Sequence, residues 1–312
     1  MLHIRVVCPP TQTALLTDSL AARPEVLNLL VAPAAARHPD GDGVQFDLQN
    51  RAANSVLAEL RAFGLDHDSS IMIEAVDATL VDRARQQLWR RSHHGERSPV
   101  WELIEARIAD EATYPPSFYL LLVMAGVIGA CGILTNSQIL IVGAMVVGPE
   151  YSAIISVALG LERRDGHPVR RGLFALVAGF VSAIAVTLVF ALCIRWVGHE
   201  PELYRSGVRP VSDLINSPNL FSVVVAVLAA VVGVVSLTLS RAGALIGVFI
   251  SVTTIPAAAD IGVSLAFGGW REARGSTVQL LLNVVVLVVI GAVALRAQRL
   301  IWGRWARRAL PP

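Results

Sequence analysis

Long apolar runs alternate with short polar gaps between about residue 117 and residue 296 of the chain. Each run is close to the ~20 residues that cover the hydrocarbon core of a bilayer, which is about 30 Å thick. The pattern predicts an all-α polytopic membrane domain of about six helices, at residues 117–134, 139–161, 172–194, 220–239, 242–268 and 277–295. Inside these runs the only charged residues are Glu150 and Asp260.

The second run contains a helix break followed by an acid. Gly148 and Pro149 lie near its middle, and Pro149 has no N–H and clashes with the preceding turn, so the helix should bend or break there. The next residue, Glu150, is costly to bury in lipid and must face a cavity, water or a partner. This combination is typical of transporter sites. The alternative is a kink for packing, with Glu150 in a structural pair.

The second half of the membrane domain echoes the first. The stretch from Gly143 to Glu150 has a counterpart that starts at Gly247, reaches a second predicted break at Pro256, and continues to Asp260. Three spans in each unit would place the second unit upside down, so the pattern favours a 3+3 inverted repeat with broken helices. In such repeats the binding site lies where the breaks meet.

The N-terminal residues 1–77 show the patterns of a small α+β domain. Period-two alternation predicts strands at 3–8, 26–31, 44–48 and 70–76, with a loop rich in Pro, Ala, Asp and Gly between the second and the third. Helical spacing predicts two helices, before Pro24 and before Gly64. The order βαββαβ is that of a ferredoxin-like cytoplasmic domain. This fold serves many functions, and a small-molecule regulatory module and a dimerising module both stay open.

Residues 78–116 are predicted to be a connector. Its first part is basic and either faces anionic headgroups or is a solvated linker. Its second part is an amphipathic helix with Val100, Leu103, Ile104 and Ile108 on one face. We expect this helix to lie against the membrane surface or against neighbouring subunits.

Composition agrees with an integral membrane protein. Hydrophobic residues make up 54% of the chain and charged residues 16%, the mean hydropathy is +0.59, and the net charge of +2 gives no reason to expect nucleic-acid binding. Cys8, Cys131 and Cys193 are dispersed, so neither a disulfide framework nor a metal site is predicted. No catalytic or cofactor-binding signature is present, and we therefore expect a protein that is not an enzyme and has no cofactor.

Arginine positions predict the orientation, because cytoplasmic loops carry an excess of Lys and Arg. The distribution predicts a multi-pass protein of the cell inner (plasma) membrane with both termini cytoplasmic and a basic tail at 297–312. Glycines predict assembly as a homo-oligomer, since small residues let membrane helices approach closely. They are the stripe Gly126, Gly129 and Gly132 and the pair Gly243 and Gly247.

Several motifs resemble one family. They are Asn136-Ser-Gln-Ile-Leu-Ile-Val-Gly143-Ala-Met-Val-Val-Gly148-Pro149-Glu150, Ser217-Pro-Asn219-Leu, Ile255-Pro256-Ala and Leu282-Asn283. This pattern is similar to the integral membrane proteins of the domain of unknown function 389 family, and the N-terminal domain resembles their actinobacterial branch. The resemblance implies an integral membrane protein with a soluble N-terminal domain and no assigned chemistry.

The leading hypothesis is a secondary transporter or channel-like protein for an unidentified small solute or ion, with a regulatory or oligomerising cytoplasmic domain. Glu150 and Asp260 would couple the ion or proton. Neutral polar contacts would come from Asn136, Tyr151, Thr253, Thr254 and Asn283. The alternative is a membrane-anchored sensor or scaffold whose soluble domain binds a ligand or partner.

Overall fold

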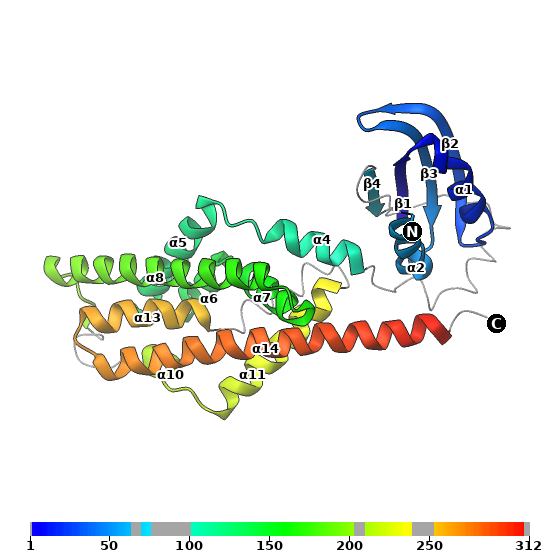
Figure 1. Ribbon diagram of the computed structural model, residues 1–312. Helices are drawn as coiled ribbons and strands as arrows, with labels where there is room; N and C mark the ends of the chain where they lie inside the picture. The colour runs from blue at the N-terminus through cyan, green and yellow to red at the C-terminus, as the bar shows by residue number, and fades with distance from the viewer. Residues whose placement is uncertain (1, 64–69, 76–100, 203–209, 239–252, 309–312) are drawn as a thin grey trace. The chain divides into compact units, whose positions relative to one another are not determined.

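The computed structural model describes residues 2–63, 70–75, 101–202, 210–238 and 253–308 (Figure 1). Contacts divide the chain into two compact units. One contains residues 1–104 and 300–312, and the other contains residues 105–299. We describe each unit by itself.

The N-terminal unit is built on a four-stranded antiparallel sheet with the order β2-β3-β1-β4. Its elements follow the predicted order βαββαβ (Figure 1). They are β1 (Leu2–Cys8), α1 (Pro10–Ala21), β2 (Val26–Arg37), β3 (Asp40–Leu48), α2 (Asn50–Ala62) and β4 (Ser70–Ala75).

Alternation along the strands produces the core of this sheet. Every second residue of β1 is buried, and the inward residues of β3 meet them from the neighbouring strand. Both helices contribute leucines to the same cluster. The largest buried side chains are Leu2, Ile4, Leu16, Leu20, Phe46, Leu48 and Leu60.

The prediction of a loop between the second and third strands is wrong, because the two strands extend through that segment and form a long hairpin. β2 runs to Arg37 and β3 starts at Asp40, with register shifts on the way. The buried Asp42 carboxylate accepts a 2.6 Å hydrogen bond from Thr13 Oγ1 and a 2.7 Å bond from the Ala34 N–H. The bond from Thr13 ties the long hairpin to α1, and the bond from Ala34 joins β2 to β3 within it. The composition of the segment did not indicate either bond.

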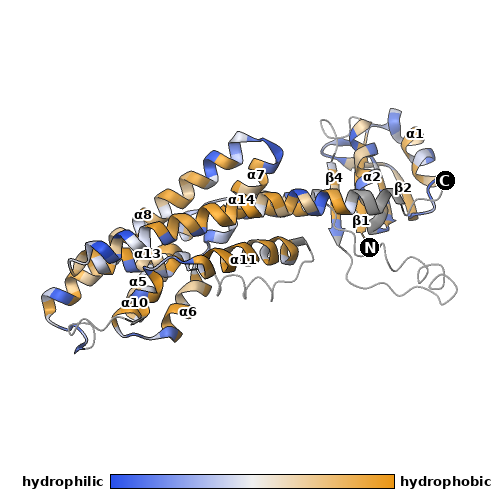
Figure 2. Ribbon diagram, turned by 90° about the horizontal axis from the view of Figure 1, so that it is seen from below, coloured by the Kyte–Doolittle hydropathy of each residue, from blue (hydrophilic) through white to orange (hydrophobic). Residues whose placement is uncertain are grey.

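The second unit is helical and mostly apolar (Figure 2). It contains most of α4 (Trp101–Glu111), then α5 (Pro116–Leu134), α6 (Gln138–Val147), α7 (Glu150–Arg163), α8 (Gly166–Val197), α10 (Pro210–Ile215), α11 (Leu220–Thr238), α13 (Thr254–Ala266) and most of α14 (Trp270–Arg308), up to Arg299.

Within the described residues, α5, α8, α11 and α14 are long and apolar enough to cross a membrane. The bent pair α6 and α7 makes a fifth crossing if it counts as one span. Of the predicted helix 242–268, the described part is the 13-residue α13, and residues 239–252 lie outside the description. Helices α8 and α14 extend past the predicted runs because hydropathy indicates where a helix is in lipid, and a helix can continue into water.

The glycine stripe of α5 is buried inside the chain. A Cβ at Gly126 would lie 2.9 Å from Thr187 Oγ1 of α8, and one at Gly129 would lie 2.9 Å from the Ala259 Cβ of α13. These glycines let α5 pack closely against α8 and α13. The stripe therefore gives no argument for a homo-oligomer, and Gly243 and Gly247 lie outside the described residues.

The second half of α4 packs against its own chain. Ile108 is only 1% exposed, and with residues of α7 and α8, including Leu159 and Pro168, it lines a pocket of about 300 Å³. The apolar face that we expected to meet lipid or a neighbouring subunit is therefore covered, at Ile108, within the chain.

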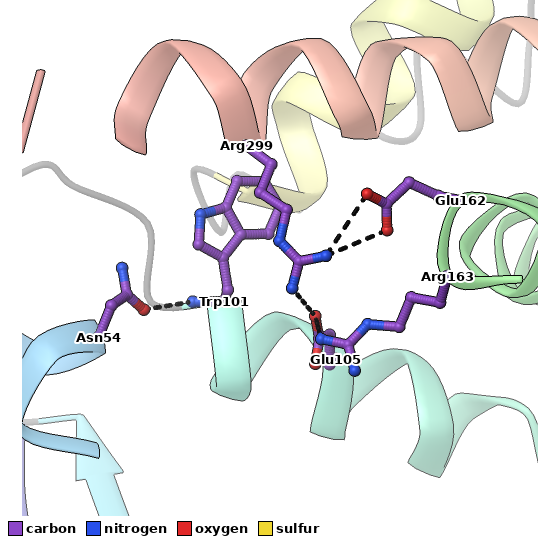
Figure 3. Close-up of polar contacts among 6 residues, drawn as sticks. All are labelled: Asn54, Trp101, Glu105, Glu162, Arg163 and Arg299. Atoms are coloured by element: carbon purple, nitrogen blue, oxygen red, sulfur yellow. Dashed lines mark hydrogen bonds and ion pairs between the residues drawn. The ribbon is translucent and has the colours of Figure 1, made fainter. Parts of the chain in front are cut away.

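Ion pairs hold α4, α7 and α14 together (Figure 3). Glu105 of α4 pairs with Arg163 of α7, and its Oε1 lies 3.2 Å from Arg299 Nη2 of α14. Arg299 Nη1 also lies 3.2 Å from Glu162 Oε2. The first residues of α4 belong to the N-terminal unit. Within that unit the Trp101 N–H donates a 3.2 Å hydrogen bond to Asn54 Oδ1 (Figure 3).

Candidate functional site

The helix break predicted at Gly148 and Pro149 is confirmed. Helix α6 ends at Val147, α7 begins at Glu150, and the two helices are bent by 52°. Gly148 is extended, as expected for a residue that precedes proline. Pro149 is the N-cap of α7, and no side chain caps this helix end.

The predicted break at Pro256 corresponds to the start of α13. The helix begins at Thr254, so Pro256 lies in its first turn, where the missing N–H has no partner to lose. Thr253 is the N-cap, and its side chain makes no capping hydrogen bond. The structure does not describe the residues before 253.

Glu150 and Thr254 join the starts of these two helices. Thr254 Oγ1 donates a 2.6 Å hydrogen bond to Glu150 Oε1. Thr254 is fully buried and Glu150 is 6% exposed, and Glu150 Oε2 has no hydrogen-bond partner among the described residues. A Cβ at Gly148 would contact Oε2 and would lie 2.8 Å from Ile255 Cδ1. The carboxylate therefore occupies a tight space that only glycine leaves open.

Packing on α8 shows that α7 and α13 meet start to start. Gly172 of α8 packs against Val157 of α7, and Thr187 of α8 packs against Gly262 of α13. These two α8 positions are about 22 Å apart at 1.5 Å per residue. By the same rise, Val157 is about 10 Å from the start of α7 and Gly262 about 12 Å from the start of α13. The distances along α7 and α13 add up to the distance of about 22 Å between Gly172 and Thr187 on α8. Both helices therefore begin about half-way along α8.

Contacts on α14 lead to the same arrangement. Its earlier turns contact α13, since Asn283 Nδ2 donates to Thr253 Oγ1 at 2.9 Å. Its later turns contact α7, where a Cβ at Gly291 would lie 3.3 Å from the Ala158 Cβ. Helices α7 and α13 therefore run in opposite directions away from the contact between Glu150 and Thr254. Figure 1 shows α13 between α8 and α14.

Asp260 lies in a separate polar cluster. Its carboxylate is fully buried and accepts hydrogen bonds from Ser212 Oγ at 2.6 Å, Ser276 Oγ at 2.6 Å and Ser264 Oγ at 3.4 Å. Asp260 is six residues beyond Thr254, which is about 9 Å along the helix. The two acids share no hydrogen-bond partner among the described residues. The serines come from α10, α13 and α14, so this cluster ties three helices together.

The site lies in a region that other proteins share. Residues 145–289 match the sequence profile described as Domain of unknown function (DUF389). These residues belong to the DUF389 family. The match confirms the resemblance given by the motifs, and it includes Glu150, Thr254, Asp260 and Asn283. Comparisons with curated proteins and with solved structures found no match.

Three of the other predicted site residues, Tyr151, Thr253 and Asn283, lie in the DUF389 region, and Asn136 lies just before it. Thr253 and Asn283 lie beside Thr254 and form one polar group with Gln279, whose Nε2 is 3.2 Å from Asn283 Oδ1. Tyr151 packs on α11, where a Cβ at Gly233 would lie 2.8 Å from the Tyr151 Cζ. Asn136 precedes the DUF389 match and lies in the turn between α5 and α6, with a φ of 52°.

Sequence reasoning missed several residues of the two DUF389 clusters. On α14, the missed Ser276 and Gln279 precede the predicted Asn283 at helical spacing, and the three form a polar stripe on an apolar helix. Ser264 is one turn after Asp260 on the same helix. Both signals were present in the sequence. Ser212 had no local signal, because α10 reaches Asp260 only through the tertiary fold.

The described residues contain no group of three or more His, Cys, Asp or Glu side chains that could hold a metal ion. In the DUF389 region the donors around each acid are hydroxyls and amides of Ser, Thr, Gln and Asn. The chemistry that this arrangement can support is proton binding and hydrogen bonding to a small ligand.

Proposed function

We propose that this protein is a secondary transporter or channel-like protein for a small solute or ion, with Glu150 as the coupling residue. One observation carries the proposal, namely that Glu150 is buried at the meeting point of two helix starts and keeps one carboxylate oxygen without a partner in the described part of the chain. A buried acid without an ion pair is costly, and an apolar residue would serve packing at least as well. An ionisable residue inside a membrane is therefore a functional-site hypothesis by default.

The orientation proposed for this function has both termini in the cytoplasm of a plasma-membrane protein. Basic residues gather at one end of the helical unit, where Arg299 of α14 and Arg163 of α7 pair with acids. The opposite end contains Arg195 of α8, which donates to the Ala266 carbonyl at 2.6 Å. More arginines lie at the end with Arg163 and Arg299 than at the end with Arg195. Because cytoplasmic segments carry an excess of Lys and Arg, we place the end with more arginines on the cytoplasmic side.

The same proposal covers the repeat architecture of the helices, the fold and role of the N-terminal domain, and the role of Asp260. The opposite directions of α7 and α13 support an inverted repeat built on two broken helices. The βαββαβ order and the sheet order support a ferredoxin-like domain, with a regulatory or oligomerising role. We assign Asp260 to holding α10, α13 and α14 together, because three hydroxyls already satisfy its oxygens.

Flux in liposomes tests the proposal. Full-length protein is reconstituted with an internal pH dye, and gradients of small anions, cations and neutral solutes are applied in turn. We expect at least one solute to drive proton movement, and Glu150→Gln to reduce that movement to the level of protein-free liposomes. Ser182→Ala is the matched control, because among the described residues this hydroxyl of α8 bonds only to the Gly179 carbonyl of its own helix. Full coupled flux in Glu150→Gln would contradict the proposal.

The second candidate is a membrane-anchored sensor or scaffold. The deep burial of Glu150 favours it, because a closed site can also be a static structural contact. This candidate expects wild-type liposomes to show no solute-driven flux for any member of the panel. It also expects Glu150→Gln to leave ligand or partner binding by the N-terminal domain unchanged.

A further inference from the structure

Two buried helix starts face the same carboxylate. The N-terminus of a helix carries about +0.5 of an elementary charge, because its first N–H groups have no partner within the helix. Neither α7 nor α13 has a side-chain cap. Glu150 and Tyr151 begin one helix, Thr254 and Ile255 begin the other, and all four residues are buried. These donors lie away from water, so an anion would stabilise them.

Glu150 itself supplies the negative charge at this point. The two helix starts together amount to about one positive charge, and an ionised Glu150 carboxylate balances it. When a proton binds to Glu150, the balance is lost and about one positive charge remains. A cation would then be repelled, whereas a monovalent anion would restore neutrality.

A second observation points to a ligand here. One carboxylate oxygen of the buried Glu150, Oε2, has no hydrogen-bond partner among the described residues, and a proton bound there makes it a donor to an anion. Gln279 Nε2, an amide donor, lies 3.4 Å from Thr253 Oγ1 at the N-cap of α13. Buried polar atoms without partners are rare in folded proteins and mark places that a ligand or proton completes.

We propose that this site takes a small monovalent anion together with one proton, and that the proton is carried by Glu150. The inference rests on the proposed transport function and names its substrate class. The proton adds to the Glu150 carboxylate and forms a neutral acid, whose O–H can donate to the anion. The first N–H groups of both helices supply the other donors, while Thr254 Oγ1 keeps its hydrogen bond to Glu150 Oε1. The step is an association of one anion with one proton, so no net charge is added and no bond of the anion is broken.

Other titratable groups near Glu150 are few among the described residues. On α7 the neighbour is Tyr151, whose ring packs against Gly233 of α11. On α13 it is Asp260, about 9 Å beyond Thr254 along the helix and held by three serines. The contacting residues of α14, Gln279 and Asn283, are neutral. Glu150 is therefore the group from which we expect the pH dependence of anion binding.

Thermal unfolding in detergent tests the inference without any flux measurement. Full-length protein is kept at constant sodium, and gluconate is replaced in turn by chloride, nitrate, formate or acetate at pH 5.5 and pH 7.5. We expect at least one of these anions to raise the Tm of the wild type at pH 5.5. Its half-saturating concentration should increase by up to about tenfold per pH unit, because one proton is taken up with each anion.

Glu150→Gln imitates the protonated acid, so the same anion should stabilise this variant equally at both pH values. Gly143→Ala is the control, since a Cβ there meets no atom of the described residues within 4 Å, and it should behave as the wild type. The inference is overturned if no anion shifts the Tm of either protein, or if the shift follows sodium, potassium or choline at constant anion. It also fails if the anion effect in Glu150→Gln keeps the wild-type pH dependence.

The flux and binding experiments separate the two proposals. A pH-dependent anion shift without flux would reject transport and keep the anion site. Flux driven by a cation or a neutral solute, without any anion shift, would keep transport and reject the anion site.

Discussion

Thr254 Oγ1 donates a 2.6 Å hydrogen bond to Glu150 Oε1, and each of these residues is the first of its helix. The bond joins two segments that are 104 residues apart in the chain. Because α7 and α13 run away from it in opposite directions, the bond lies where two helix dipoles converge. At this position the partial positive charges of the two helix N-termini, which come from backbone N–H groups, act on the Glu150 carboxylate.

Gly148 should control the position of the Glu150 carboxylate. In Gly148→Ala the new Cβ would meet Glu150 Oε2 and the Ile255 side chain, which are both ends of flexible side chains. We expect the fold to survive with a loss of about 1–3 kcal/mol, as in overpacked cores, and the coupled flux to fall strongly. Thermal unfolding and liposome flux measure the two effects.

The matched control for this change is Gly143→Ala on α6, where a Cβ meets no described atom within 4 Å. Alanine is the better helix former, so its stability should stay equal or rise by up to about 1 kcal/mol. Normal flux in Gly148→Ala would show that the carboxylate does not need this space.

The serine cluster should stabilise the helical unit through Asp260. In Ser276→Ala a buried carboxylate oxygen loses a 2.6 Å hydrogen bond, and we expect destabilisation by about 1–3 kcal/mol. Ser182→Ala removes a hydroxyl that bonds only within its helix and should change stability by less than about 0.5 kcal/mol. Thermal unfolding compares the two variants, and equal melting temperatures would argue against a structural role for Asp260.

Glu105 should contribute more than an ordinary surface acid, because it contacts both Arg163 and Arg299 and its side chain is 15% exposed. Glu105→Gln should therefore destabilise the contact of α4 with α7 and α14 by roughly 1 kcal/mol. Hydrogen exchange of α4 peptides is the measurement. Glu111→Gln is the control, because its pair with Arg107 is exposed and within one helix, and its effect should be about 0.5 kcal/mol or less.

Acid should loosen the β2–β3 hairpin at Asp42. Its hydrogen bond from Thr13, and then that from the Ala34 N–H, hold the pKa of the Asp42 carboxyl below its ordinary value. The folded state therefore binds this proton less well than the unfolded state does. The stabilisation is complete above the unfolded pKa of about 3.9 and is lost as the pH falls through the lower folded pKa.

Hydrogen exchange of β2 and β3 peptides, corrected for intrinsic rates, measures this loss between pH 5 and pH 3. Asp42→Asn removes the titration, so its hairpin should be less protected at pH 5 and should change less on acidification. A hairpin that keeps the same acid sensitivity in Asp42→Asn would assign the effect to another group.

Local rules predicted the parts of the structure that depend on one stretch of chain. The bend at Gly148 and Pro149 follows from a missing N–H and a steric clash, which any helix would experience. The strand and helix order of the N-terminal domain follows from period-two and helical spacing of its apolar residues. The membrane character follows from apolar runs that cannot be buried in a soluble fold of this size.

Pairing across the chain could not be predicted in the same way. The sequence suggested that Glu150 and Asp260 are coupling residues of one site where the helix breaks meet. The structure places them in separate clusters, one with Thr254 and one with three serines. The glycines of α5 indicated a close helix contact, and only the fold revealed that the partners are α8 and α13 of the same chain.

The amino-acid sequence is therefore enough to identify the apolar segments, the position of a helix break and the acid at that break. Only the packing of the helices brings the break at Pro149 to the start of α13 and makes Thr254, rather than Asp260, the contact of Glu150. The physical reason is that hydropathy and proline geometry act over a few neighbouring residues. The partner of a buried carboxylate depends on how helices more than 100 residues apart pack against α8 and α14.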